Sequence, residues 1–196
     1  MRWLWLLACV AALDGCTHTT TPAEAPKKCP PQNVTVSILA SQATNPTATG
    51  QPRPVVVRLY QLKDDERLYG AAFEQMWHED KATLGEDLVK VDEIQVYPAS
   101  RTDVQFPRPE PVRHLAAVAL FTQPQGQSWF SVFDLPAPPE DGKCSEKACR
   151  EDDDECIGRA ASAPHYAFWI DRNTVDDGVE HLEDFPRVGA MRSKEP

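Results

Sequence analysis

The chain has 196 residues, with 20 Lys and Arg against 30 Asp and Glu, which gives a formal net charge of −10. Hydrophobic residues make up 41% and charged residues 26%, so the sequence can fill a core and lacks the composition of a disordered chain. Its 18 prolines disfavour a helix bundle, because proline is costly inside helices. The acidic balance offers no basic surface for nucleic acid, and none is expected as a partner.

The N-terminus has the pattern of a lipoprotein signal peptide. Eleven apolar residues, 3–13, follow a positive residue and are too few to span a membrane. The sequence Leu13-Asp14-Gly15-Cys16 then resembles the bacterial lipobox. In that motif the cysteine sulfur takes a diacylglyceryl group before the chain is cleaved on the N-terminal side of the cysteine. Asp14 departs from the small or apolar residue usual at its position. The alternative is an ordinary secretory signal with a coincidental cysteine. We expect a signal peptide over 1–15 and a lipid anchor on Cys16.

The residue after the anchor predicts the destination. Thr17 stands where an aspartate typically holds such lipoproteins in the inner membrane, so we expect the periplasmic face of the outer membrane. Residues 16–32 are rich in Thr, Pro, Lys and Ala without periodicity, which is typical of an extended tether.

Four further cysteines belong to the mature protein: Cys29, Cys144, Cys149 and Cys156. The periplasm is oxidising, so they can form two disulfides, with three pairings open. A zinc site is the competing interpretation, but there is no C-x2-C pair and the spacing matches no common structural zinc pattern. We expect no metal, and at least one disulfide among the last three cysteines.

The predicted elements begin with a strand over 33–39, where Val34, Val36 and Ile38 alternate at period two. A long loop rich in turn formers, 41–54, precedes a second strand over 55–62. One short amphipathic helix is predicted over 70–78, with Leu84 on the same face and Gly85 as a natural end.

A β pattern returns in the second half of the chain. Strands are predicted over 88–96, 101–106, 115–121, 128–135 and 166–170, and the apolar run 115–121 is typical of a strand covered on both faces. These elements predict an all-β domain over 33–175, a two-sheet antiparallel β-sandwich with one short added helix. A Cys-rich acidic insert, 137–164, interrupts it, and a charged C-terminal tail is expected over 176–196.

The sequence contains no recognisable catalytic motif. It has no Gly-rich phosphate loop, no nucleophile elbow and no dinucleotide fingerprint. His78-Glu79 opens like a zinc-protease helix, but Ala82 stands where the second histidine is needed. We therefore expect no catalytic residues, no cofactor and no enzymatic activity.

The first loop contains Asn45-Pro46, Gly50 and Pro54, and the second strand ends in Tyr60-Gln61-Leu62. In order and spacing they resemble the TssJ (SciN) family of type VI secretion outer-membrane lipoproteins. The similarity covers roughly residues 33–136 and resumes at Tyr166, while the insert 137–164 has no counterpart.

The resemblance implies a transthyretin-like β-sandwich that is not an enzyme. It also implies binding to the periplasmic C-terminal domain of TssM, which associates with TssL, so that the lipoprotein anchors the secretion complex to the outer membrane. The family's main contact is the loop between the first two strands. We place it here at Asn45, Pro46, Thr47, Gly50, Gln51 and Pro52. Prolines restrict the loop before binding and lower its ordering cost.

A second hypothesis is a lipid-anchored periplasmic module that binds a small ligand or carbohydrate. It requires exposed aromatic side chains, for which Trp129, Phe130, Phe168 and Trp169 are the candidates, although we expect at least half of them in the core. A lipid-anchored enzyme is a third and weaker hypothesis.

Overall fold

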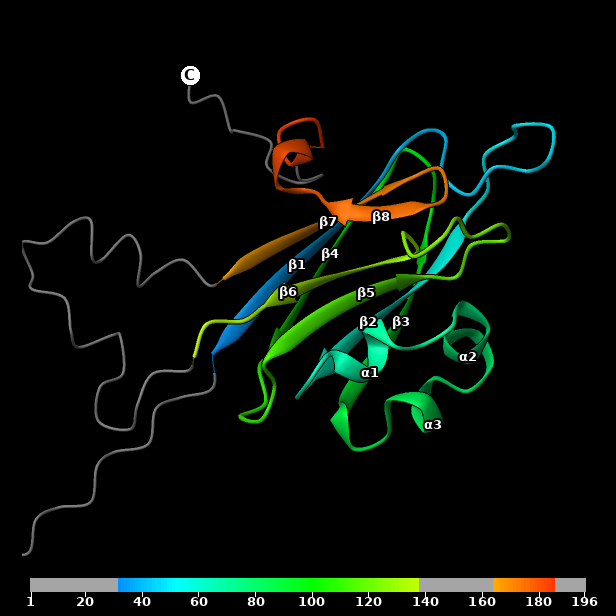
Figure 1. Cartoon of the computed structure of the whole chain (residues 1–196). Coiled ribbons are helices and arrows are strands. Elements are labelled where there is room, and N and C mark those ends of the chain that lie inside the picture. Colours follow the sequence, from blue (N-terminus) through cyan, green and yellow to red (C-terminus); the bar gives the residue numbers. More distant parts are fainter. Residues whose placement is uncertain (1–31, 138–163, 186–196) are drawn as a thin grey trace, which may run out of the picture.

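The strands form a two-layer sandwich in a computed structural model that describes residues 32–137 and 164–185 (Figure 1). Sheet A has the strand order β4-β1-β7-β8 and sheet B the order β3-β2-β5-β6. The predicted all-β, two-sheet architecture is confirmed. The bounds are β1 Asn33–Ala40, β2 Val55–Leu62, β3 Leu88–Val96, β4 Arg101–Pro107, β5 His114–Ala119, β6 Phe130–Asp134, β7 His165–Asp171 and β8 Thr174–Asp177.

Strand β1 lies inside sheet A, antiparallel to β4 and parallel to β7, whereas the other paired strands are all antiparallel. The parallel pair refines the antiparallel pattern expected from the sequence. Its cause is topological. β6 ends, and β7 begins, at the end of the sandwich where β1 also begins, so β7 must run in the same direction as β1.

The core lies between the two sheets and follows the predicted alternation. Val34, Val36 and Ile38 are fully buried and belong to one cluster with Val57 and Leu59. The cluster also takes in every residue of 115–119. A strand whose consecutive residues are all buried must be covered on both faces, and short helices cover the outer face of sheet B (Figure 1).

The helical region differs from the single helix that the sequence predicted. It consists of α1 Glu66–Tyr69, α2 Phe73–His78, α3 Asp80–Leu84 and the 3-10 turn η1 Gly85–Asp87.

The side chain of Arg58 explains why α2 and α3 are separate. Arg58 Nη1 donates to the carbonyl oxygens of Met76 at 2.8 Å and Trp77 at 3.2 Å. In a continuous helix these carbonyls would accept from the backbone N–H groups of residues 80 and 81. The guanidinium therefore takes the place of the next helical turn.

The C-terminal region has regular structure beyond residue 175, where we expected the domain to end. That boundary falls inside β8, and the 3-10 turn η3 Val179–His181 follows it. The ring of His181 stacks on Trp169 with centroids 4.0 Å apart. Gly178 lies so close to β7 that an added Cβ would stand 2.8 Å from the carbonyl carbon of Phe168. Residues 176–185 therefore pack against sheet A.

Several expectations concern residues outside the described ranges, namely 1–31, 138–163 and 186–196. They are the signal peptide, the lipid anchor on Cys16, the tether, and disulfides among Cys29, Cys144, Cys149 and Cys156, and they stay predictions. Within 32–137 and 164–185, no helix is long and apolar enough to cross a membrane.

Candidate functional site

The loop between β1 and β2, residues 41–54, is held at its base by Asn45. This residue is 5% exposed and has a φ of 46°, a left-handed conformation that asparagine adopts more readily than most residues. Its side-chain Nδ2 donates to Pro54 O at 3.0 Å, and its Oδ1 accepts from Thr122 N at 3.1 Å. Its backbone N–H donates to Arg172 O at 2.7 Å. One residue thus joins the two sides of the loop to each other and to two neighbouring connections.

Arg53 closes the base from the other side. Its backbone N–H donates to Thr44 O at 3.0 Å, and its Nη2 donates to Thr122 Oγ1 at 2.9 Å. Thr44 is fully buried, and its hydroxyl lies within hydrogen-bonding distance of Ser41 O and Ile170 O. The base is therefore integrated into the sandwich.

The tip of the loop, residues 46–52, is held by contacts within itself. Thr47 N donates to Gln51 O at 2.8 Å, and Gly50 N donates to Thr47 O at 2.9 Å. The hydroxyl of Thr47 also accepts from Gln51 N at 3.0 Å. Gly50 has a φ of 82°, which favours glycine. The tip is a small closed turn that extends beyond the sheets (cyan in Figure 1).

The six residues predicted for partner contact divide between base and tip. Gly50, Gln51 and Pro52 are exposed, and Pro46 and Thr47 are partly exposed, so these five lie in the tip. Asn45 is buried in the base, where it supports the loop. The sequence alone did not identify Arg53 and Thr122 as anchors of the loop. Thr122 lies 69 residues from Arg53 and 77 residues from Asn45, and no local pattern indicates that these residues bind one another.

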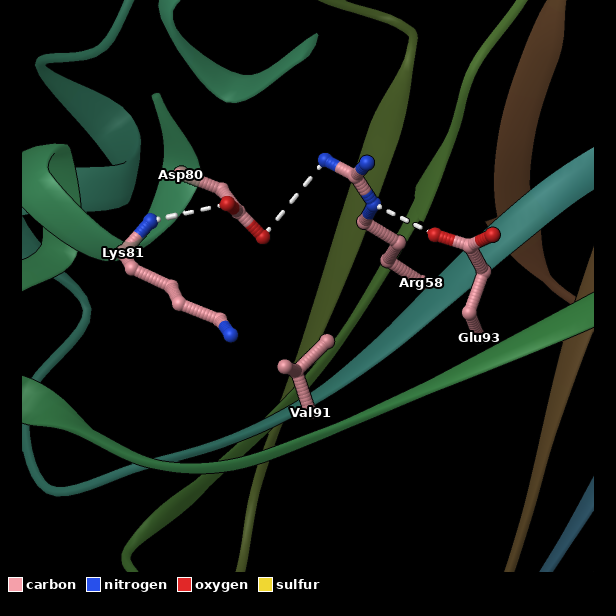
Figure 2. A pocket seen from close by; sticks show the side chains of 5 residues that line it. All are labelled: Arg58, Asp80, Lys81, Val91 and Glu93. Carbon is pink, nitrogen blue, oxygen red and sulfur yellow. Dashed lines mark hydrogen bonds and ion pairs between the residues drawn. The ribbon is translucent and has the colours of Figure 1, made fainter. Parts of the chain in front are cut away.

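A pocket of about 410 Å³ lies between sheet B and α3 and is lined by Arg58, Asp80, Lys81, Val91 and Glu93. Figure 2 shows the Arg58 guanidinium between two carboxylates, with Nε 3.1 Å from Glu93 and Nη1 3.5 Å from Asp80. The hydroxyl of Tyr60 donates to Asp80 at 2.8 Å. Burial raises the pKa of Tyr60 well above its usual range, and the hydrogen bond to Asp80 and the negative charge of Asp80 raise it further. The phenol therefore stays neutral. The charged groups of Arg58 and Asp80 therefore attach the helices to sheet B.

A serine, a histidine and an aspartate meet on the outer face of sheet A. Ser37 Oγ donates to Asp103 Oδ1 at 2.6 Å and lies 2.7 Å from His165 Nε2. Arg101 donates to both Ser37 Oγ and Asp103. In a catalytic triad the carboxylate orients the histidine, whereas here it accepts from the serine, which is fully buried. The cluster ties three adjacent strands together.

The aromatic residues proposed for a ligand face are largely buried. Trp129, Phe130 and Phe168 are at most 8% exposed, and Trp169 is covered by the ring of His181. The expectation that at least half of them lie in the core is confirmed. The ligand-binding hypothesis thereby loses the exposed rings on which it depended.

Residues 32–149 match the model of the type VI secretion lipoprotein family described by the names VasD, EvfM, TssJ and VC_A0113. The match spans more than half of the chain. The chain belongs to this family. The resemblance to TssJ proteins is confirmed. The family consists of membrane-bound scaffold lipoproteins of type VI secretion and is not known to contain enzymes. A comparison with curated protein sequences finds no match.

Solved structures of type VI secretion proteins share the fold. The lipoprotein TssJ1 from Pseudomonas aeruginosa is 24% identical with a TM-score of 0.58, over 75% of this chain and 95% of that one. Serratia marcescens Lip, a membrane-bound component of the type VI secretion system, is 17% identical with a TM-score of 0.61, over 75% and 97%. A structure described as the TssM C-terminal domain from EAEC is 22% identical with a TM-score of 0.53, over 74% and 97%.

Proposed function

We propose that this family member is anchored by lipid on Cys16 to the periplasmic face of the outer membrane, and that its 41–54 loop binds the periplasmic C-terminal domain of TssM. Through TssM, and TssL behind it, the protein would anchor the secretion complex to that membrane. The observation that carries the proposal is the preformed tip, residues 46–52, which projects from the sandwich on a fixed base.

The internal hydrogen bonds of the tip support a binding role. Thr47 contacts Gln51 through both its backbone and its hydroxyl, so much of the tip's conformation is set before any partner arrives. A preorganised loop loses less conformational entropy on binding. The tip has no aromatic residue, so backbone hydrogen bonds and shape, rather than large apolar side chains, would carry recognition.

The direction of β1 also supports the proposal. The residues expected to form the tether end where β1 begins, at Asn33, and the loop follows the far end of β1 at Ala40. At about 3.3 Å per residue, the eight residues of β1 span roughly 26 Å. The attachment point of the anchor and the loop tip would therefore lie at opposite ends of β1, which leaves the tip accessible to a partner in the periplasm.

Replacing residues 46–52 with a Gly-Ser segment of equal length tests the partner contact. Asn45 stays in place, so the base keeps its hydrogen bonds. We expect titration calorimetry with the TssM periplasmic domain to show binding of micromolar affinity or tighter for the natural chain, on the order of −8 kcal/mol, and none for the variant, with nearly unchanged thermal melts.

The matched control replaces residues 123–127, a turn at the same end of the sandwich, with Gly-Ser. This variant should bind TssM like the natural chain. Equal affinity of the natural chain and the 46–52 variant would show that the tip is not the contact.

The anchor is tested separately by Cys16→Ser. Because lipidation comes before cleavage, the variant should accumulate as an unlipidated precursor that keeps residues 1–15, and it should be lost from the outer-membrane fraction because lipid chains supply the membrane affinity. A Cys16→Ser protein that still fractionates with the outer membrane would refute the anchor without bearing on TssM binding.

A further inference from the structure

Three possible metal ligands converge at the end of sheet B opposite the 41–54 loop. Asp65 precedes α1, His114 is the first residue of β5, and Asp134 is the last residue of β6. One ligand atom from each lies within 4.8 Å of the other two. The two strand residues are direct cross-strand partners, so the sheet itself fixes their proximity.

Both carboxylates approach the same imidazole nitrogen. His114 Nδ1 lies 2.9 Å from Asp134 Oδ1 and 3.5 Å from Asp65 Oδ2. A single ring nitrogen donates at most one hydrogen, and 3.5 Å is too long for a good hydrogen bond. Even a protonated His114 would carry only one positive charge against two negative ones. The cluster therefore has an excess of negative charge.

Asp65 makes this imbalance costly. Its side chain is only 24% exposed, and although it occupies the N-cap position of α1, it makes no capping hydrogen bond. Within 32–137 and 164–185 its carboxylate has no hydrogen-bond donor closer than the imidazole. A largely buried carboxylate normally accepts hydrogen bonds or binds a cation. This one makes no capping hydrogen bond and lies 3.5 Å from His114 Nδ1.

The three ligand atoms lie close enough together to bind one small ion. Zinc bonds of about 2.0–2.2 Å to nitrogen and oxygen place neighbouring ligand atoms of a tetrahedron roughly 3.3–3.6 Å apart. The 3.5 Å between His114 Nδ1 and Asp65 Oδ2 lies in this range. The 2.9 Å between His114 Nδ1 and Asp134 Oδ1 is a hydrogen-bond distance, which the exposed Asp134 side chain would lengthen by about 0.4 Å on binding an ion. We propose that Asp65, His114 and Asp134 form a binding site for a divalent transition-metal ion of the zinc type.

The donor set decides the class of ion. An imidazole nitrogen suits zinc and its neighbours, whereas magnesium and calcium prefer all-oxygen ligands. Asp134 is 86% exposed, so the site opens to solvent and water fills the remaining position. Such a site binds more weakly than a closed structural zinc site. A bound ion would join the start of α1 to the β5–β6 hairpin.

Zinc itself is the probe for the test. The full-length protein, in detergent and with free thiols alkylated so that cysteines cannot bind metal, is titrated with Zn²⁺ against a chromophoric chelator. The variants are His114→Asn and Asp134→Asn. The second alters a side chain that is already mostly in solvent and should leave the fold intact. His78→Asn, an exposed histidine on α2, is the matched control.

We expect the natural chain and His78→Asn to bind one equivalent of zinc more than His114→Asn. Asp134→Asn should bind it at least about tenfold more weakly, since residues that merely support a metal ligand already cost that much. Saturating zinc should also raise the melting temperature of the natural chain by about 5 °C, but not that of His114→Asn. Equal zinc binding by all four proteins, or none by the natural chain, overturns the proposal.

Discussion

The base and the tip of the 41–54 loop are held in place in different ways. The base is joined to the sandwich by Asn45 and Arg53, whose hydrogen bonds reach Thr122 and Arg172. The tip is joined mainly to itself, through Thr47, and its outer residues are exposed. Two segments adjacent in the sequence therefore perform separate tasks: one supports the loop, and the other is available to a partner.

Substitutions within one loop can therefore report on different properties of the protein. A change in the base alters the free energy of unfolding and reaches any partner only indirectly. A change in the tip leaves most of the fold intact and acts on binding directly. The following predictions test that separation, the larger effect on stability first.

Asn45→Ala should have the larger effect on stability. It removes the bonds to Pro54 O and Thr122 N, leaves those backbone groups without their partner, and places alanine at positive φ. We expect the free energy of unfolding to fall by about 2–4 kcal/mol, measured by urea denaturation.

Asn45→Gly separates the two causes. Glycine tolerates the positive φ but cannot make the side-chain bonds, so this variant should recover about 1 kcal/mol relative to alanine. A loss below about 0.5 kcal/mol for Asn45→Ala would mean that the base is not anchored by this side chain.

Gly50→Ala should have a smaller effect on stability and a clear effect on TssM binding. The position has a φ of 82° with nothing within 4 Å of an added Cβ, so the cost, about 1 kcal/mol, comes from the backbone alone. Because the strained turn shifts the tip, titration calorimetry should show weaker binding.

Gly126→Ala is the matched control, since its φ is 53° and an added Cβ there also meets nothing within 4 Å. It should lower stability by a similar amount and leave the affinity for TssM unchanged. If both glycine variants bind equally well, the tip does not act as proposed.

The strands could be predicted from the sequence because burial alternates along them. Val34, Val36 and Ile38 mark β1, and the apolar run 115–121 marks a strand covered on both faces. The strand β8 was not predicted, since only Val175 among its four residues is buried. A strand that short, with two aspartates, resembles a charged tail when only the sequence is available.

The remaining features depend on contacts between distant residues. The division of the helix follows from Arg58, which lies 18 residues before the carbonyl of Met76 that it binds. The anchoring role of Asn45 depends on Thr122, 77 residues away. The proposed metal ligands Asp65, His114 and Asp134 share no motif, so no pattern in the sequence predicts a metal there. Local patterns cannot encode such pairings.

The position of β1 has a mechanical consequence. If the protein is anchored before Asn33 and held by its partner at the loop, tension between the anchor and the partner runs along β1 from one end to the other. A β-strand is already nearly fully extended, so it transmits such a pull through its covalent backbone with little stretching. Its hydrogen bonds to β4 and β7 lie across the direction of the force and would share it with the rest of sheet A. The domain would then behave as a stiff link that stays folded while the secretion machine works against the cell envelope.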